Sequence, residues 1–216
     1  MSTTGWSLPA PGDPRCQSCD GVRVVLARYI THPEVVVDAT VAVNRWTLSE
    51  RGLARLDRLL EAPWLETIGR IVCSDETKAR QTAEVLSERR GLPIEVRADT
   101  GEIDRSATGV LPVDEHERCA DACFAAPTVS ARGWERAIDA QRRIASALED
   151  LFIEDQSSDV AVVGHGGVGT LWYCYLADVP IDRRWDQPHQ GHYFSVDLQT
   201  RRPLHRWRPF EDAADS

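Results

Sequence analysis

Two short stretches of this sequence carry side chains suited to binding an anion such as phosphate. The first, residues 28–32 (RYITH), continues an apolar run, and the second, residues 164–167 (GHGG), follows another. A guanidinium grips phosphate bidentately, and a neutral imidazole is nucleophilic because its unperturbed pKa is about 6.5. Glycines at a helix start expose backbone N–H groups where the helix dipole favours an anion. If the two strands are neighbours, both stretches meet at one edge of a sheet.

Alternating apolar runs and helical patterns supply the elements that would position these residues. The apolar runs predict strands over residues 22–27, 68–73, 94–97, 159–163, 192–198 and 204–207. Apolar residues at helical spacing, with caps, predict helices from residue 47 and over residues 75–90, 134–152 and 168–176. Residues 99–130 are predicted to be an irregular insertion or lid with one short helix. This alternation favours an α/β fold with a mainly parallel central sheet and helices on both faces, where ligands bind beyond the carboxyl ends of the strands.

Length and charge limit the domain organisation and the classes of partner. A chain of 216 residues suits a single domain over residues 21–216, after a flexible arm at residues 1–20 that contains three prolines. The net charge of -9 argues against nucleic acid or anionic lipid as a partner. Neither a segment of ~20 apolar residues nor the pattern of a secretion signal is present in the sequence. We therefore expect a cytoplasmic protein of unknown oligomeric state.

The six cysteines are expected to be reduced thiols, because Cys73 and Cys174 fall inside predicted core elements. Zinc binding by two cysteine pairs is disfavoured, because Cys16/Cys19 lies in the arm and Cys119/Cys123 has the spacing CxxxC. We expect neither a metal nor a cofactor.

Three other enzyme classes fit the sequence less well. Gly164, Gly166 and Gly169 satisfy GxGxxG, but no strand ending in an acid follows about twenty residues on, as dinucleotide binding requires. A serine hydrolase is disfavoured because no GxSxG motif occurs. A metal hydrolase is the better rival, although its candidate ligands lack the helical spacing of HExxH: His32, His165, Glu102, Asp104 and His189 or His192.

Four motifs in this order resemble those of the histidine phosphatase superfamily (phosphoglycerate mutase-like). They are the first strand with Arg28, then residues 48–52 (LSERG), 74–84 (SDETKARQTAE) and 162–168 (VVGHGGV), and the resemblance spans roughly residues 22–200. It implies a phosphohistidine mechanism without metal, acting on a small phosphorylated substrate. A histidine attacks phosphorus, a carboxylic acid protonates the leaving oxygen, and water hydrolyses the intermediate.

The position of the nucleophile depends on how the first strand is aligned. In similar proteins this strand runs into an arginine-histidine pair, and the preferred alignment places Arg28-Tyr29 there. Tyr29 then replaces the histidine, and a phenol with a pKa of about 10 is a poor nucleophile at neutral pH. A second alignment places Thr31-His32 on the pair, which keeps a histidine, loses the arginine and lengthens the strand. In either case His32 is close enough in sequence to supply an imidazole.

The resemblance also implies the remaining site residues. Lys78 stands where an arginine is usual, so its point charge should hold an anion more weakly, and Ser74 lies one turn before it. His165 would stabilise charge on the transferring phosphoryl group, and Glu102 would be the proton donor, with Asp104 as a competing acid. Arg105 belongs to a loop that similar proteins fold over the pocket.

The sequence therefore predicts a slow, metal-independent phosphomonoester hydrolase with Tyr29 or His32 as nucleophile. The alternative is an inactive family member that binds an anion or a protein partner, and Tyr29 and Lys78 are the reasons to consider it.

Overall fold

The computed structural model of the chain describes residues 24–155 and 157–215. The predicted arm at residues 1–20 and the Cys16/Cys19 pair lie outside these residues. In the described part, Cys73, Cys119, Cys123 and Cys174 are buried free thiols, and no helix there has the length and apolar character needed to cross a membrane.

The described residues form one central sheet in the order β3-β2-β4-β1-β5-β6, with β7 paired to β5. The neighbours β2 and β3, β2 and β4, and β1 and β4 are parallel, whereas β5 is antiparallel to β1. The mainly parallel sheet is thus confirmed. The strands are β1 Leu26–Thr31, β2 Ile68–Cys73, β3 Ile94–Val96, β4 Asp159–Gly164, β5 His192–Asp197, β6 Arg202–Pro203 and β7 Arg208–Pro209.

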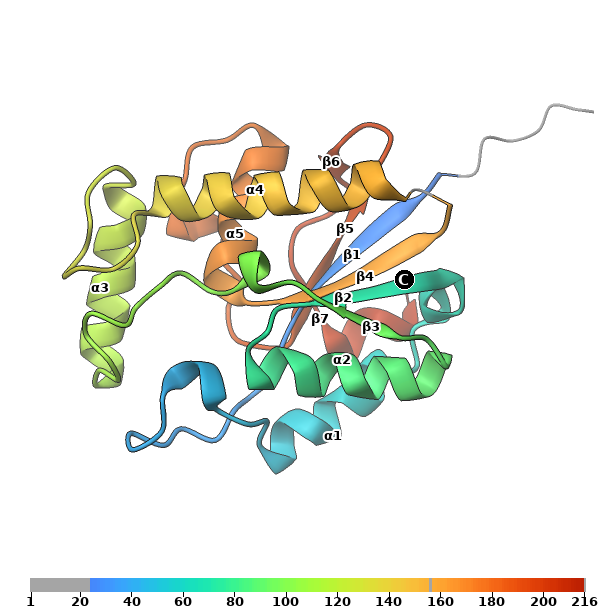
Figure 1. The fold of residues 1–216 in the computed structure, drawn as a ribbon, viewed down its shortest axis with the longest axis horizontal. Coiled ribbons are helices and arrows are strands. Elements are labelled where there is room, and N and C mark those ends of the chain that lie inside the picture. Colours follow the sequence, from blue (N-terminus) through green and yellow to red (C-terminus); the bar gives the residue numbers. More distant parts are fainter. Residues whose placement is uncertain (1–23, 156, 216) are drawn as a thin grey trace, which may run out of the picture.

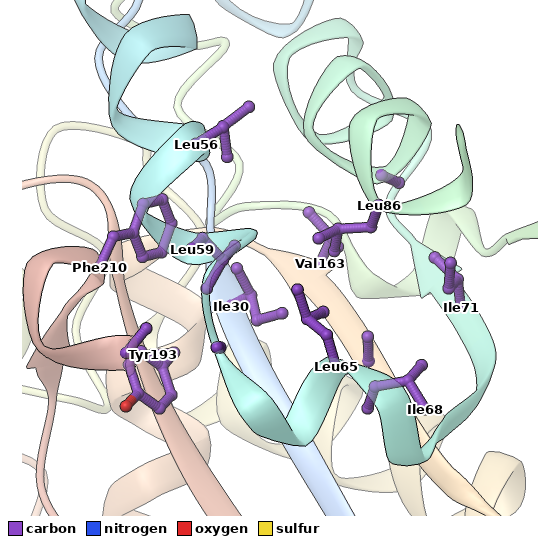
Figure 2. Close-up of a cluster of buried hydrophobic side chains, with 14 of the residues drawn as sticks. Ile30, Leu56, Leu59, Leu65, Ile68, Ile71, Leu86, Val163, Tyr193 and Phe210 are labelled. Carbon is purple, nitrogen blue, oxygen red and sulfur yellow. The ribbon is translucent and has the colours of Figure 1, made fainter. Parts of the chain in front are cut away.

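Helices cover both faces of the sheet, as predicted (Figure 1). One face packs against α1 and α2 through a cluster that includes Ile30, Leu56 and Val163 (Figure 2). The other face packs against α4 and α5 through Tyr29, Leu148 and Trp172. The helices are α1 Glu50–Leu59, α2 Thr77–Arg90, α3 Val113–Ala125, α4 Ala137–Glu154 and α5 Gly166–Ala177.

The first strand ends four residues later than predicted, and this changes which side chain stands at its carboxyl end. Arg28 does not end the strand, because its guanidinium lies 5.1 Å from the Trp64 ring centroid and donates to Ser195 Oγ. The next two residues, Tyr29 and Ile30, point to opposite faces and are completely buried. The strand therefore runs to Thr31, and His32 is the first residue beyond it.

The predicted last strand over residues 204–207 is wrong. The chain forms only two short pairings, β6 and β7, on either side of this segment. Side chains between them serve packing instead, since Trp207 contacts Tyr29 edge-on at 6.1 Å between ring centroids. The short helix predicted inside residues 99–130 is confirmed as α3.

Candidate active site

A cavity of about 600 Å³ lies beyond the carboxyl ends of the parallel strands, where the fold predicts a ligand. Its walls come from the segment after β1, the start of α2, residues 102–113, α3, the start of α5 and residues 183–190. His32, Lys78, Glu102 and Arg105 line it, whereas Arg28 and Tyr29 do not.

His32 is held at the end of β1 with one ring nitrogen available. Its backbone N–H donates to Gly164 O (3.1 Å), which continues the pairing with β4. Its Nδ1 lies 2.8 Å from Pro33 O, and because a carbonyl can only accept, Nδ1 carries the proton. Nε2 then keeps its lone pair, and it has no hydrogen-bond partner among the described residues. Burial, with the nearby His165 and Lys78, lowers the His32 pKa to about 3, so the imidazole is neutral at pH 7.

His165 stands beside His32 at the end of β4, with 5.4 Å between the two ring centroids. Its Nε2 lies 2.7 Å from Ser74 Oγ and 3.4 Å from Glu76 Oε1, whereas its buried Nδ1 has no partner in the described segments. Burial lowers the His165 pKa, and the carboxylates of Glu76 and Glu102 oppose this only in part. The predicted role for a protonated His165 therefore requires that an incoming anion supply the missing counter-charge.

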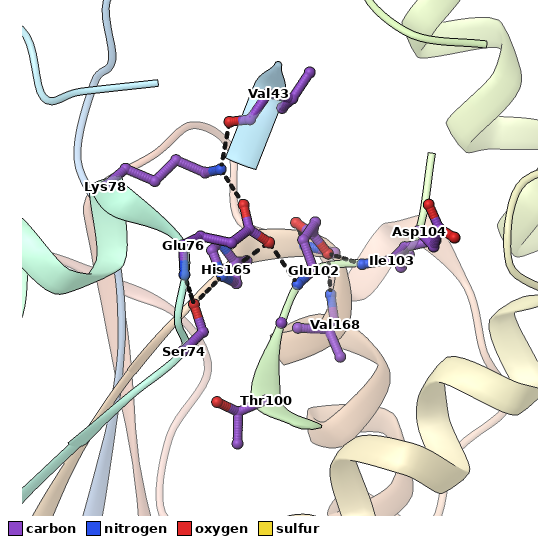
Figure 3. A network of polar contacts seen from close by, with 12 residues as sticks. Val43, Ser74, Glu76, Lys78, Thr100, Glu102, Ile103, Asp104, His165 and Val168 are labelled. Atoms are coloured by element: carbon purple, nitrogen blue, oxygen red, sulfur yellow. Dashed lines mark hydrogen bonds and ion pairs between the residues drawn. The ribbon is translucent and has the colours of Figure 1, made fainter. Parts of the chain in front are cut away.

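Lys78 points toward the site but is already paired with a carboxylate (Figure 3). Its Nζ donates to Val43 O (3.0 Å) and forms an ion pair with Glu76, and only 3% of its side chain is exposed. The other carboxylate oxygen of Glu76 accepts from Glu102 N (3.0 Å). Burial raises the Glu76 pKa, but His165, Lys78 and the hydrogen bonds together bring it down to about 2. The positive charge predicted for phosphate is thus balanced within the protein.

The sequence prediction missed Glu76 because residues two apart on a helix do not face each other. Glu76 lies at the N-cap of α2 with extended backbone (ψ 138), which turns its side chain toward that of Lys78. An acid at the N-cap of the SDETK segment was the available signal.

Glu102 binds the start of α5, where we had expected a phosphate. Its carboxylate accepts from the backbone N–H groups of Gly167 (3.1 Å), Val168 (2.8 Å) and Ile103 (2.9 Å). Burial raises the Glu102 pKa, but Arg105, His165 and the hydrogen bonds outweigh it, so the pKa lies below its ordinary value. A proton donor must be protonated, and this arrangement keeps Glu102 ionised.

Three other predicted residues differ in how they relate to the cavity. Asp104 is exposed, does not line it, and caps a turn by accepting from Ser106 N (2.8 Å). Arg105 lines it, with its guanidinium 5.5 Å from the Trp134 ring centroid. Ser74 is buried and reaches the site only through its hydrogen bond to His165.

The structure places Arg28 and Tyr29 outside the lining of the cavity. The Tyr29 hydroxyl accepts from His165 N and donates to His165 O, both at 3.2 Å, and burial raises its pKa, so the phenol stays protonated. A Cβ on Gly164 or Gly169 would lie 2.4 Å or 2.3 Å from Tyr29 atoms. These glycines therefore make room for the tyrosine ring, whereas a Cβ on Gly166, the middle glycine of GxGxxG, would meet Gln187. His32, which the second alignment places on the family pair, lines the cavity, whereas Arg28 and Tyr29 of the preferred alignment do not.

Asp186 is an acidic residue of the cavity that the sequence prediction missed. It accepts from Thr170 Oγ1 and Gln187 N, both at 2.8 Å, and lies 3.1 Å from Arg183 Nε. Burial outweighs these contacts and raises its pKa to about 6. Asp186 lies in an irregular loop, where no periodic pattern marked it.

The rival metal site has no counterpart in the described part of the chain, where no group of three or more histidine, cysteine, aspartate or glutamate side chains is placed to hold a metal ion.

Solved structures with the same fold include Bacillus stearothermophilus YhfR and two proteins named as phosphatases. Bacillus stearothermophilus YhfR is 23% identical (84% of this chain, 95% of that chain, TM-score 0.68). A mycobacterial glucosyl-3-phosphoglycerate phosphatase complexed with inorganic phosphate is 20% identical (85% and 94%, TM-score 0.68). Phosphoserine phosphatase from Entamoeba histolytica, in complex with 3-phosphoglyceric acid, is 12% identical (85% and 96%, TM-score 0.69). These similarities establish the fold. No curated protein matches the chain.

The model of the histidine phosphatase superfamily (branch 1) matches residues 42–205, which is most of the sequence. The match begins after β1 and His32, so it does not test the nucleophile. It contains Ser74, Lys78, Glu102 and His165, and it supports a phosphatase-type function. On this match and this fold, the chain belongs to the histidine phosphatase superfamily.

Proposed function

We propose that this protein hydrolyses phosphomonoesters without a metal ion, with His32 as the nucleophile. The observation that carries the proposal is the His32 ring, neutral and fixed through Nδ1, with Nε2 unpartnered among the described residues and His165 alongside. A neutral imidazole nitrogen with a free lone pair is what attack on phosphorus requires.

The reaction follows in two steps. His32 Nε2 forms a bond to phosphorus while the bond to the ester oxygen breaks, and that oxygen takes a proton from an acid. Water then attacks the phosphohistidine, which returns Nε2 and releases inorganic phosphate. The Nδ1 hydrogen bond to Pro33 O stabilises the positive charge that the ring carries in the intermediate. Lys78 and Arg105 would face the phosphoryl oxygens from the cavity wall.

For the proton donor, Asp186 competes with Glu102. Both line the cavity, but the pKa of Asp186 is about 6, so about a tenth of it is protonated at pH 7. Glu102 stays ionised at the start of α5. We therefore place Asp186 ahead of Glu102, and Asp186→Asn should remove the alkaline limb of the pH profile of kcat, whereas Glu102→Gln should leave it in place.

The solved phosphatases support a small phosphorylated substrate. The mycobacterial glucosyl-3-phosphoglycerate phosphatase has been solved with inorganic phosphate and with VO3. Its fold is shared by this chain, and the cavity described here lies at the same sheet edge as His32 and His165.

The test is phosphate release from a panel of phosphomonoesters, with and without chelator, for wild type, His32→Ala and Tyr29→Phe. We expect chelator-insensitive turnover that His32→Ala abolishes and Tyr29→Phe retains, together with an acid-labile, base-stable phosphohistidine in the wild type. Turnover that survives His32→Ala would contradict the proposal, and loss of turnover with chelator would favour a metal enzyme.

A second candidate, an inactive member that binds an anion or protein partner, is favoured by two observations. Lys78 is already paired with Glu76, and Thr31 replaces the arginine of the family pair. Vanadate or phosphate binding without turnover on any substrate would support this candidate.

A further inference from the structure

The cavity has a second, apolar region whose side chains the proposed reaction does not use. We call it the outer wall, and its residues are apolar: Val37, Val43, Trp46, Leu111, Val113 and Phe124. They come from the segment after β1 and from α3 with the residues before it, and both of these regions lie beyond the ends of the strands (Figure 1).

Two valines of the outer wall are unusually exposed. Val37 is 67% exposed and Val113 is 77% exposed, although both border the same cavity. Isolated exposed apolar residues are ordinary, but apolar residues gathered around one concave site indicate a binding surface.

The charged residues close to the outer wall are engaged with one another. Arg183 pairs with Glu117 (3.0 Å) and with Asp186 (3.1 Å). Arg105 contacts His116 and stacks near Trp134. A sugar or other polyhydroxyl group would have to share these charged groups with their present partners, whereas an apolar group can lie against the valines without competing for them.

The cavity is also much larger than a phosphate needs. Its volume of about 600 Å³ falls in the ~300–1,000 Å³ range of sites that hold whole organic ligands. A phosphoryl group beside His32 leaves the outer wall to the rest of the substrate.

From these observations we infer that the substrate is a phosphomonoester whose alcohol part is a bulky apolar or aromatic group seated on the outer wall. This inference rests on the proposed function, because it takes a phosphomonoester as the substrate. The apolar lining of the outer wall does not depend on which residue attacks phosphorus.

The experiment compares kcat/KM for ethyl, hexyl and decyl phosphate and for glycerol 1-phosphate. The alkyl esters share one leaving-group chemistry, so only the apolar area changes along the series. We expect kcat/KM to rise about two- to fourfold per methylene up to hexyl phosphate, and glycerol 1-phosphate to be the poorest substrate.

Two variants and a matched control locate the effect. Val37→Ser and Val113→Ser change exposed side chains, so both variants should fold normally. Each should reduce the ratio of kcat/KM for hexyl phosphate to kcat/KM for ethyl phosphate about three- to tenfold. Val129→Ser changes another exposed valine, which does not line the cavity, and should leave the series unchanged.

Binding separates failure of this inference from failure of the proposed function. Decyl phosphonate, which cannot be hydrolysed, should bind at least tenfold tighter than ethyl phosphonate in calorimetry, and Val113→Ser should reduce that difference. If nothing is turned over but this difference is found, the proposed function fails and the apolar site stands. If phosphate esters are turned over with no dependence on chain length, or the phosphonates bind equally, the inference is overturned.

Discussion

The two regions of the cavity are built by different means. The inner wall comprises His32 and Lys78, which line the cavity, together with His165 and Glu76, which contact them from behind the lining. These side chains lie at or next to strand ends and a helix start, and each is held by a hydrogen bond or ion pair. The outer wall consists of apolar residues on a long segment after β1 and around α3, and its valines at positions 37 and 113 are mostly exposed.

This difference separates chemistry from selectivity. Groups that must meet a reacting phosphorus need fixed positions, which the sheet edge supplies, whereas a surface that accepts an apolar group needs area more than exact placement. A substitution in the inner wall should therefore act on turnover or on the anion, and one in the outer wall on the preference among alcohols. Four predictions test this division.

The largest effect is expected for His165→Ala. His165 stands 5.4 Å from His32, ring to ring, where negative charge would develop on the phosphoryl group. Its loss should lower kcat by about 100- to 1,000-fold, as for other groups that stabilise transition-state charge. Phosphate release should still favour hexyl over ethyl phosphate by the same factor. A kcat within threefold of wild type, or a changed chain-length preference, would contradict the separate roles given to the inner and outer walls.

The second prediction concerns pH and the stability of the inner wall. The His32 pKa of about 3 lies below its ordinary value, so the unfolded chain takes up a proton before the folded protein does. The contribution of neutral His32 to the free energy of unfolding is complete above the ordinary histidine pKa, and it is lost as the pH falls from there toward 3. At pH 5 the loss should be about 2 kcal/mol, from about 1.4 kcal/mol per pKa unit. Urea unfolding at pH 7 and pH 5 should show this difference between wild type and His32→Gln, because other histidines contribute equally to both. An equal pH dependence in the two proteins would mean that His32 is not a buried neutral imidazole.

The third prediction concerns the internal carboxylate. Glu76→Gln keeps the shape and the acceptor for Glu102 N but removes the charge that balances Lys78. Phosphate and vanadate should then bind about tenfold tighter, equivalent to about 1.4 kcal/mol. Glu88→Gln makes the same change at an exposed position of α2 and should have no effect. Calorimetry with inorganic phosphate measures both, and equal affinities in all three proteins would show that Glu76 does not oppose the anion.

The sequence predicted the fold and the ends of β2 and β4 well, because buried parallel strands are continuous apolar runs with clear breaks. It predicted the end of β1 poorly. Arg28 interrupts the apolar run, and only the tertiary contacts with Trp64 and Ser195 show that a strand can carry it there. This difference of four residues decides which side chain stands at the carboxyl end of the strand.

The site residues divide in the same way. His165 and Lys78 could be predicted from the sequence because each lies within a short linear motif, VVGHGGV or SDETKARQTAE. The contacts of Glu76 and Glu102 depend on how two loops approach α2 and α5, and a pattern along the chain contains no information on that approach. Asp186 joins the site only because residues 183–190 fold back over the start of α5.

The smallest effect is expected for Tyr29→Phe, and it tests where the inner wall ends. The Tyr29 hydroxyl accepts from the backbone N–H of His165 and donates to its C=O, while the Tyr29 ring packs against Trp172 and Phe194. Removing the oxygen leaves two buried backbone groups with one partner fewer, which should cost about 1 kcal/mol of unfolding free energy. Because the phenol supports His165 without facing the cavity, kcat/KM should stay within about threefold of wild type, and the chain-length preference should not change. A loss of turnover as large as that of His165→Ala, without a comparable loss of stability, would place Tyr29 among the reacting groups and favour the alignment of Arg28-Tyr29 with the family pair.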